Sequence, residues 1–136
     1  DKYGWAFKNS GADWYTRLIN NKPSFCIDGT GEESNSWLIS PSFNLSAYNS
    51  ADLRFDRFYL NGEDIQLYYT TSNYTSGDAI IQSNWTEIEL PPYESNNWET
   101  KTISIPTTAK HIAFRYTGST SKNYLRGIII NVKESN

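Results

Sequence analysis

The sequence predicts an all-β domain, a jelly-roll β-sandwich made of two antiparallel sheets. Many short segments alternate apolar and polar residues with a period of two, and turn-forming residues separate these segments. The composition is also rich in aromatic residues, with ten Tyr, six Phe and five Trp, which are residue types that favour strands. About seven or eight short strands with turns between them are typical of a sandwich or jelly roll. The 136 residues fit one domain, which we expect to span residues 1–136.

The expected strands share brief runs of alternating or continuous apolar character, and they cover residues 36–40, 53–60, 65–71, 86–90, 103–105, 112–116 and 127–132. In the third of these runs, Ile65, Leu67 and Tyr69 point to one face and the intervening residues to the other. The last run is apolar on both faces, which predicts a central strand. The best helix candidate is short and covers Asp13 to Asn20.

Two irregularities are expected around the second strand. The apolar phase slips between Phe55 and Phe58, which predicts a β-bulge near Asp56. Asn61-Gly62 separates this strand from the next one, and that dipeptide predicts a β-hairpin turn.

Charge and cysteine content exclude several functions. The net charge is −3 and the 12 basic residues are scattered, so we expect no nucleic-acid partner. No apolar run approaches the roughly 18 residues that a membrane-spanning helix needs. Cys26 is the single cysteine, so an internal disulfide and a cysteine metal cluster are excluded. The lack of bridges favours bacterial export over eukaryotic secretion, although a cytosolic protein would lack them too. Asp1 in place of Met indicates a mature or trimmed chain.

Several short segments occur together in a distinctive order along nearly the whole chain. They are Gly4-Trp5 and residues 11–14, 36–41 (SWLISP), 43–46 (FNLS), 53–55, 69–72, 85–88, 113–118 (AFRYTG) and 129–132. This order resembles the choice-of-anchor J, or cleaved-adhesin, type domains of Bacteroidetes surface proteins, which include gingipain adhesin modules. The resemblance implies a jelly-roll sandwich, export to the cell surface or periplasm, and no known catalytic residues. It also implies roles in adhesion, in haemoglobin or host-protein binding, and in glycan binding.

The same resemblance bears on metal binding. Family members often carry an aspartate in the final strand that can help to hold a structural calcium, and this chain has Ile130 there. Asp13 remains in the other expected ligand region. Because calcium takes six to eight oxygen ligands, Ile130 disfavours calcium. We therefore expect no cofactor, with Asp13 as the one weak candidate for a metal ligand.

Aromatic residues outside the expected core are the sharpest functional feature. Sugar rings stack their C–H faces on flat aromatic side chains, while neighbouring polar groups hydrogen-bond the hydroxyls. Tyr93, Asn97 and Trp98 lie in a polar loop, Trp85 enters a strand out of phase with its apolar residues, and Tyr68 lies on the polar face of its strand. We expect these five residues to bind the ligand, at the loops of one end of the sandwich.

A structural role for the same rings stays open. In that interpretation the aromatic side chains cap the ends of the sandwich, and Trp85 and Trp98 belong to the framework. Trp5 and Trp37 are expected in the core, because large aromatic residues are mostly buried.

No residue pattern indicates catalysis. Glu87 and Glu89 share one face of a strand, which predicts a solvated face rather than a pair of catalytic carboxylates. His111 is the only histidine, and its position opposite Ile112 and Phe114 in phase predicts that it lies on the surface. The chain contains no Gly-x-Ser-x-Gly nucleophile elbow. We therefore expect no enzyme.

These observations together predict a noncatalytic binding module of an exported bacterial protein, glycan-binding or adhesive. The expected partner is a polysaccharide or a host surface protein, and the module is expected to act as a monomer outside the cell, on its surface as part of a lipoprotein, or in the periplasm. The alternative is a structural or protein-docking domain without a small ligand. A concave groove lined by Trp98 and polar side chains would favour the first function, and a flat apolar patch the second.

Overall fold

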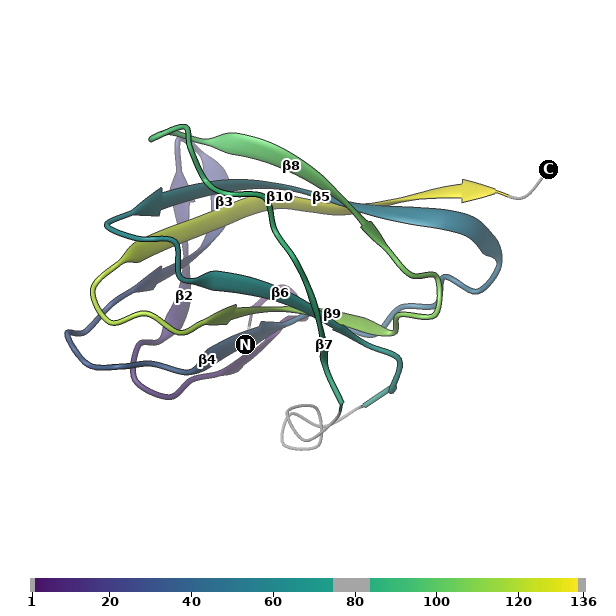
Figure 1. Cartoon of the computed structure of the whole chain (residues 1–136), viewed down its shortest axis with the longest axis horizontal. Helices are drawn as coiled ribbons and strands as arrows, with labels where there is room; N and C mark the ends of the chain where they lie inside the picture. The colour runs from purple at the N-terminus through teal and green to yellow at the C-terminus, as the bar shows by residue number, and fades with distance from the viewer. Residues whose placement is uncertain (1, 75–83, 135–136) are drawn as a thin grey trace.

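Two five-stranded antiparallel sheets pack face to face in the computed structural model, which describes residues 2–74 and 84–134 (Figure 1). Sheet 1 has the strand order β1-β4-β9-β6-β7, and sheet 2 has the order β2-β3-β10-β5-β8. The described residues contain no helix, so the predicted fold class is confirmed. The strands are β1 Ala6–Lys8, β2 Trp14–Ile19, β3 Lys22–Asp28, β4 Ser36–Ile39, β5 Tyr48–Leu60, β6 Ile65–Thr70, β7 Thr86–Ile88, β8 Glu99–Ile105, β9 His111–Tyr116 and β10 Lys122–Glu134.

The core lies between the two sheets and follows the predicted period of two. Leu67 and Phe114 from sheet 1 are fully buried, as are Leu53 and Phe55 from sheet 2. The rings of Phe55 and Phe114 meet edge to face across the core, with centroids 5.2 Å apart. Removing such a side chain from water stabilises the fold by about 1.5–3 kcal/mol. The apolar alternation therefore holds the sheets together and leaves their outer faces available for other contacts.

The long strand β10 is central in sheet 2, as predicted from its apolar character, and pairs with β3 and β5. The bulge predicted near Asp56 is on the other strand of this pair. The register shifts between Arg126 and Ile129 of β10, while β5 alternates without a break from Ala51 to Leu60. The prediction was wrong because it assigned Phe58 to the core; Phe58 lies on the outer face, and the inward position beside it belongs to the buried Arg57.

The turn between β5 and β6 crosses from one sheet to the other. Asn61 and Gly62 both have positive φ, 62° and 139°, as a tight turn at this dipeptide requires. However, β5 pairs with β8 and β10, and β6 pairs with β7 and β9. The predicted hairpin is therefore wrong, because the turn carries the chain across the core to the opposite sheet.

The helix candidate Asp13 to Asn20 is a strand. β2 and β3 form a hairpin joined by Asn20 and Asn21, whose φ values are 51° and 63°. Two consecutive positive φ angles characterise the type I′ turn that suits the twist of a hairpin. Pairing with β3 thus overrides the weak helical pattern.

His111 is buried, with only 1% of its surface exposed, so the prediction of a surface residue was wrong. Its Nδ1 lies 2.9 Å from the carbonyl oxygen of Ser40, and its Nε2 accepts a hydrogen bond from the backbone N–H of Tyr74 at 3.3 Å. Tyr74 follows β6, so this contact joins residues that are far apart in the sequence. Trp5 is half-buried and packs against Phe25 at the edge of the core, with ring centroids 5.3 Å apart.

Candidate functional site

Strand register places a row of polar and aromatic side chains across the outer face of sheet 1. Lys8 is opposite Trp37, Trp37 is opposite Arg115, and Arg115 is opposite Gln66, on the neighbouring strands β1, β4, β9 and β6. Their neighbours along each strand, such as Phe114, point into the core. Because adjacent strands lie about 4.8 Å apart, the row extends about 14 Å across the sheet.

Three aromatic rings form a platform over this face. We call Trp37, Tyr68 and Trp85 the aromatic platform. The ring of Trp37 is 5.0 Å from that of Tyr68 and 5.5 Å from that of Trp85, measured between centroids. Beneath the rings, Ile39 and Ala113 are completely buried. Since Trp37, Tyr68 and Trp85 are only half-buried, this arrangement anchors the rings from below and leaves part of each accessible.

The place of Trp37 corrects the sequence-based prediction. It was expected in the central core, but it packs on the outer side of β4 while its neighbour Leu38 points inward and is fully buried. The segment 36–39 is apolar on both faces because each face of β4 supports a separate hydrophobic cluster.

Arg115 is held rigidly against the platform. Its guanidinium carbon lies 5.1 Å from the centroid of the Trp37 ring, its Nε donates to Asn35 Oδ1 at 2.8 Å, and its Nη1 donates to the Tyr68 hydroxyl at 3.3 Å. Asn35 Oδ1 also accepts a hydrogen bond from Trp37 Nε1 at 3.1 Å. The Arg115 guanidinium is permanently charged and is fixed on two sides, so its remaining donors are oriented in advance.

Two cavities adjoin the row of side chains at its two ends. A cavity of about 200 Å³ is lined by Lys8, Asn9, Ser10, Asn35 and Trp37. Another, of about 290 Å³, is lined by Gln66 and Glu87 together with Glu63, Ile65, Ile88, Glu89, Leu90 and Pro92. The surface between them carries the platform and Arg115. The outer face of sheet 1 therefore carries a row of aromatic and polar side chains with a cavity at each end, and it is not a flat apolar patch.

The five predicted ligand-binding residues are divided between the two sides of the sandwich. Tyr68 and Trp85 belong to the platform on sheet 1. Trp98 lies on the outer side of sheet 2, where its ring is 5.7 Å from that of Phe58. The structure therefore does not bring Trp85 and Trp98 together at one end, as the sequence-based hypothesis had expected.

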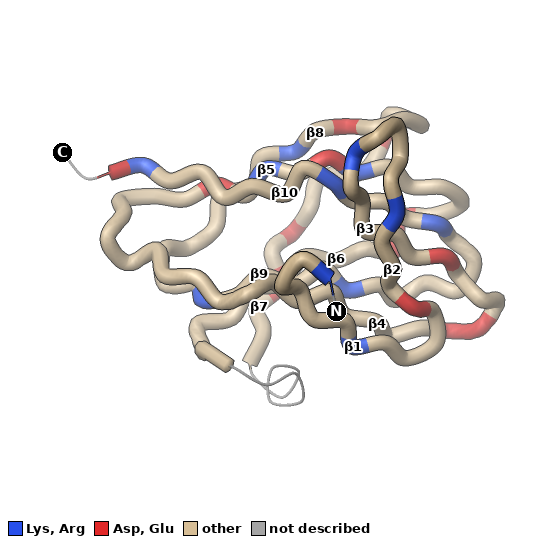
Figure 2. The backbone as a smooth tube through the Cα atoms, turned by 180° about the vertical axis from the view of Figure 1, so that it is seen from behind, with Lys and Arg blue, Asp and Glu red and all other residues tan. Residues whose placement is uncertain are grey.

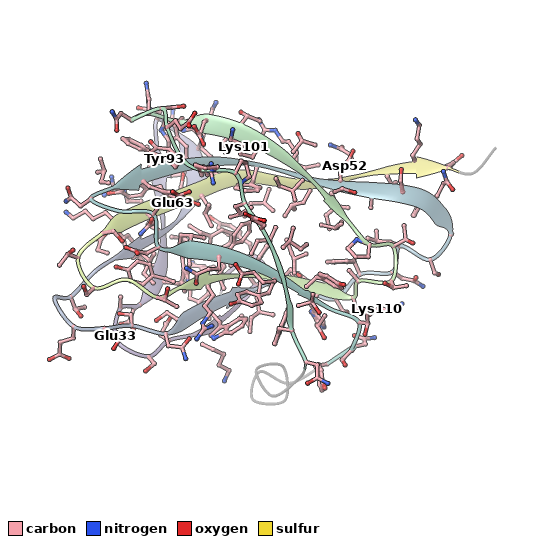
Figure 3. The ribbon with its side chains drawn as sticks, viewed as in Figure 1. Glu33, Asp52, Glu63, Tyr93, Lys101 and Lys110 are labelled. Carbon is pink, nitrogen blue, oxygen red and sulfur yellow. The ribbon has the colours of Figure 1, made fainter. Side chains whose placement is uncertain are left out.

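Tyr93 and Asn97 brace the loop between β7 and β8. Figure 3 shows Tyr93 beside Glu63 at one end of the sandwich; the Tyr93 backbone N–H donates to Glu63 Oε1 at 2.9 Å. The Tyr93 hydroxyl donates to the carbonyl oxygen of Asn97 at 2.7 Å, and its ring centroid is 5.0 Å from that of Tyr59. The side chain of Asn97 accepts a hydrogen bond from the backbone N–H of Trp98 at 2.8 Å. These contacts shape the loop that carries Trp98.

Sequence reasoning missed Trp37, Asn35 and Arg115 as site residues. The alternation in residues 36–40 and 112–116 does place Trp37 and Arg115 opposite the core positions Leu38 and Phe114. That signal shows that they face outward. It does not show that β4 and β9 are neighbours.

The described part of the chain contains no group of three or more His, Cys, Asp or Glu side chains able to hold a metal ion. Asp13 is exposed, and Ile130 is half-buried against the core. The expectation that Ile130 disfavours calcium binding remains a prediction. None of the described residues forms a helix that is long and apolar enough to cross a membrane.

This arrangement of two five-stranded sheets is the β-sandwich fold of cleaved adhesin domains and carbohydrate-binding modules. The K1 cleaved adhesin domain of Lys-gingipain from Porphyromonas gingivalis matches 100% of this chain and 94% of its own, with a TM-score of 0.62 and 17% identity. A family 61 carbohydrate-binding module in complex with beta-1,4-galactotriose matches 96% of this chain and 90% of its own, with a TM-score of 0.65 and 13% identity. A mutant of a family 29 carbohydrate-binding module matches 98% of this chain and 84% of its own, with a TM-score of 0.60 and 15% identity.

No family model and no curated protein sequence matches the chain. Identities of this size establish a shared fold. At the level of fold, the predicted resemblance to cleaved-adhesin domains is confirmed.

Proposed function

We propose that this chain is a noncatalytic glycan-binding module of an exported protein, and that its site is the outer face of sheet 1. The observation that carries the proposal is the aromatic platform with Arg115 fixed beside Trp37. Flat rings stack against the C–H faces of sugars, and a pre-oriented guanidinium donates to their hydroxyls. Rigid placement lowers the entropic cost of binding.

The shape and chemistry of the face support a glycan over a protein partner. The row from Lys8 to Gln66 crosses the strands for about 14 Å, which suits an extended chain. Polar groups lie among the rings, and hollows adjoin both ends. A protein-docking surface of this kind would be a broader and more continuous apolar patch. The neighbours in fold, which include a module solved with beta-1,4-galactotriose, support the same proposal and an extracellular location.

The proposal is tested by titrating the protein with galactotriose, with cellohexaose and with a wider array of neutral oligosaccharides. Binding is followed by calorimetry and by tryptophan fluorescence. We expect at least one neutral glycan to bind, and Trp37→Ala to lower its affinity about tenfold or more, because loss of a central aromatic contact costs about 2 kcal/mol.

Two further variants separate loss of the site from loss of the fold. Arg115→Gln removes the guanidinium without opening the cluster over Ile39, and should also weaken binding about tenfold. Trp98→Ala removes a tryptophan from the other sheet and should leave the affinity for neutral glycans unchanged. The absence of any response across the array, or equal losses in the Trp37 and Trp98 variants, would contradict the proposal.

A further inference from the structure

The outer side of sheet 2 carries a cavity of a different character. It has a volume of about 310 Å³ and is lined by Lys22, Pro23, Arg54, Asp56, Arg126 and Gly127. Three of these residues are cations and one is an acid, in a chain whose net charge is −3. Figure 2 shows basic residues on the neighbouring strands β3, β5 and β10 of this sheet. The cavity is thus a local concentration of positive charge on an acidic protein.

Arg126 lines this cavity, and two of its guanidinium nitrogens have no hydrogen-bond acceptor within the part of the chain that the structure describes. Its guanidinium carbon lies 3.7 Å from the centroid of the Trp98 ring. The nearest carboxylate oxygen, Asp56 Oδ2, is 3.6 Å from Arg126 Nε, which is beyond hydrogen-bond distance. Nε and Nη1 are both buried with no partner among the described residues. The positive charge of Arg126 is therefore only weakly compensated within the fold, and this charge lies at the wall of the cavity, where it favours an anion.

Arg54 is fixed at the same cavity by the bulge in β10. Its Nη1 donates to the carbonyl oxygen of Gly127 at 2.8 Å, and its Nη2 is 3.0 Å from Asp56 Oδ1. Asp56 Oδ1 also accepts a hydrogen bond from the Thr100 hydroxyl at 2.5 Å. Gly127 has a φ of 62°, and a Cβ atom there would overlap Arg54 Nη1. The bulge therefore positions Arg54 beside Arg126, and Asp56 offsets only one of the three cations.

We propose that this cavity binds the carboxylate or sulfate group of an acidic polysaccharide. Arg126 and Arg54 are the donors to the oxyanion, and Lys22 adds a third positive charge. Guanidinium groups match the geometry of such oxyanions. The aromatic residues beside the cavity favour a sugar as the carrier of the charge. The Phe58 ring contacts the rings of Trp98 and Tyr124, with centroid distances of 5.7 Å and 5.9 Å.

This site is separate from the proposed neutral-glycan site, because it lies on the opposite sheet and takes an anionic ligand. We would test it by calorimetry with polygalacturonate, dextran sulfate and neutral dextran, each at ionic strengths of about 0.01 M and about 1 M. We expect at least one polyanion to bind and neutral dextran not to bind. The affinity should fall at the higher salt concentration, where charge interactions are screened. Binding of polygalacturonate alone identifies a carboxylate ligand, and binding of dextran sulfate alone identifies a sulfate ligand.

The variants distinguish a built site from general attraction. Arg126→Gln and Arg54→Gln should each weaken polyanion binding about tenfold or more, as loss of a charge-assisted hydrogen bond does. Lys133→Gln makes the same change of charge on the exposed end of β10 and should change the affinity less than about threefold, because an exposed charge contributes little.

Three results would overturn the proposal: no binding of either polyanion, equal losses in the Lys133 and Arg126 variants, or equal binding of single-stranded DNA. Trp37→Ala separates the two sites. It should weaken the binding of neutral glycans about tenfold or more and leave polyanion binding intact, so that either site can fail without the other.

Discussion

Arg57 is a charged side chain in the interior of the sandwich. It is completely buried on the inner side of β5. Its Nη2 lies 2.6 Å from Glu99 Oε1 and donates to the carbonyl oxygen of Pro91 at 2.6 Å. The rings of Tyr59 and Tyr93 lie 5.4 Å and 5.7 Å from its guanidinium carbon. Arg57 thereby ties β5 to β8 and to the loop that precedes β8.

The ion pair makes stability depend on pH. Burial by itself raises the pKa of Glu99, but hydrogen bonds from Ser95 and Arg57 and the nearby positive charges outweigh it, so the pKa is lowered. A carboxylate with a lowered pKa stabilises the fold above its unfolded pKa of about 4.3. That contribution is lost as the pH falls through the folded value.

Glu99→Gln should therefore lower the free energy of unfolding at pH 7 by about 3 kcal/mol, because it leaves Arg57 buried without its closest charged partner. The difference from the parent protein should shrink as the pH falls below about 4. Urea denaturation at several pH values measures both effects. Glu94→Gln, at an exposed residue of the loop that precedes β8, serves as the control. A deficit that stays constant down to acidic pH would show that the ion pair is not its source.

Cys26 should be unreactive in the folded protein. Its side chain is completely buried, and burial raises the pKa of its thiol to about 11. Since the thiolate is the reactive form, a thiol reagent at pH 8 should label the native protein negligibly and the urea-unfolded protein fully. Rapid labelling of one thiol in the native state would contradict the buried position.

At the scale of the elements, the bulge in β10 links the backbone of one strand to the outer surface of sheet 2. The chain needs a left-handed residue at Gly127, and the freed carbonyl oxygen there accepts a hydrogen bond from Arg54. Bulges of this type commonly have glycine at that position. The bulge therefore shifts the register between β10 and β5, and it also holds Arg54 at the proposed anion site.

Gly127→Ala should lower the free energy of unfolding by about 1–3 kcal/mol, because it strains the backbone and displaces Arg54. Gly31→Ala is the matched control. Gly31 also has positive φ, 94°, but a Cβ atom there would have no neighbour within 4 Å. We expect a smaller loss for the control, measured by urea denaturation. Equal losses would mean that backbone strain alone accounts for the effect and that Arg54 is not fixed by the bulge.

The whole molecule should behave as one cooperative unit. The two sheets share one core, and β5 leads directly across that core into β6. Small single domains with such a core usually unfold in a single transition. Far-UV circular dichroism reports on both sheets, and tryptophan fluorescence reports on the platform and on Trp98. The two urea transitions should therefore coincide, and separate midpoints would contradict the prediction of a single domain.

Much of the fold follows from local pattern in the sequence. The inward positions of Leu67, Phe114 and Leu53 are readable from alternation, since the side chains of a strand point alternately to its two faces. The same rule identifies the outward faces of Tyr68 and Arg115. The rule of alternation fails at Phe58, because this aromatic residue lies outside the core but was taken for a core residue. The burial of the Arg57 charge could not be predicted either, because its partner Glu99 is far away in the sequence.

The sequence by itself determined the class of fold and which side chains leave the core, since both depend on a period of two within each strand. Only the tertiary structure decided which strands are neighbours. That order places Trp37, Arg115 and Tyr68 on one face, and Trp98 and Arg126 on the opposite one. The physical reason is that strand pairing joins residues far apart in the chain, and it is selected by burial of the whole core rather than by any local segment.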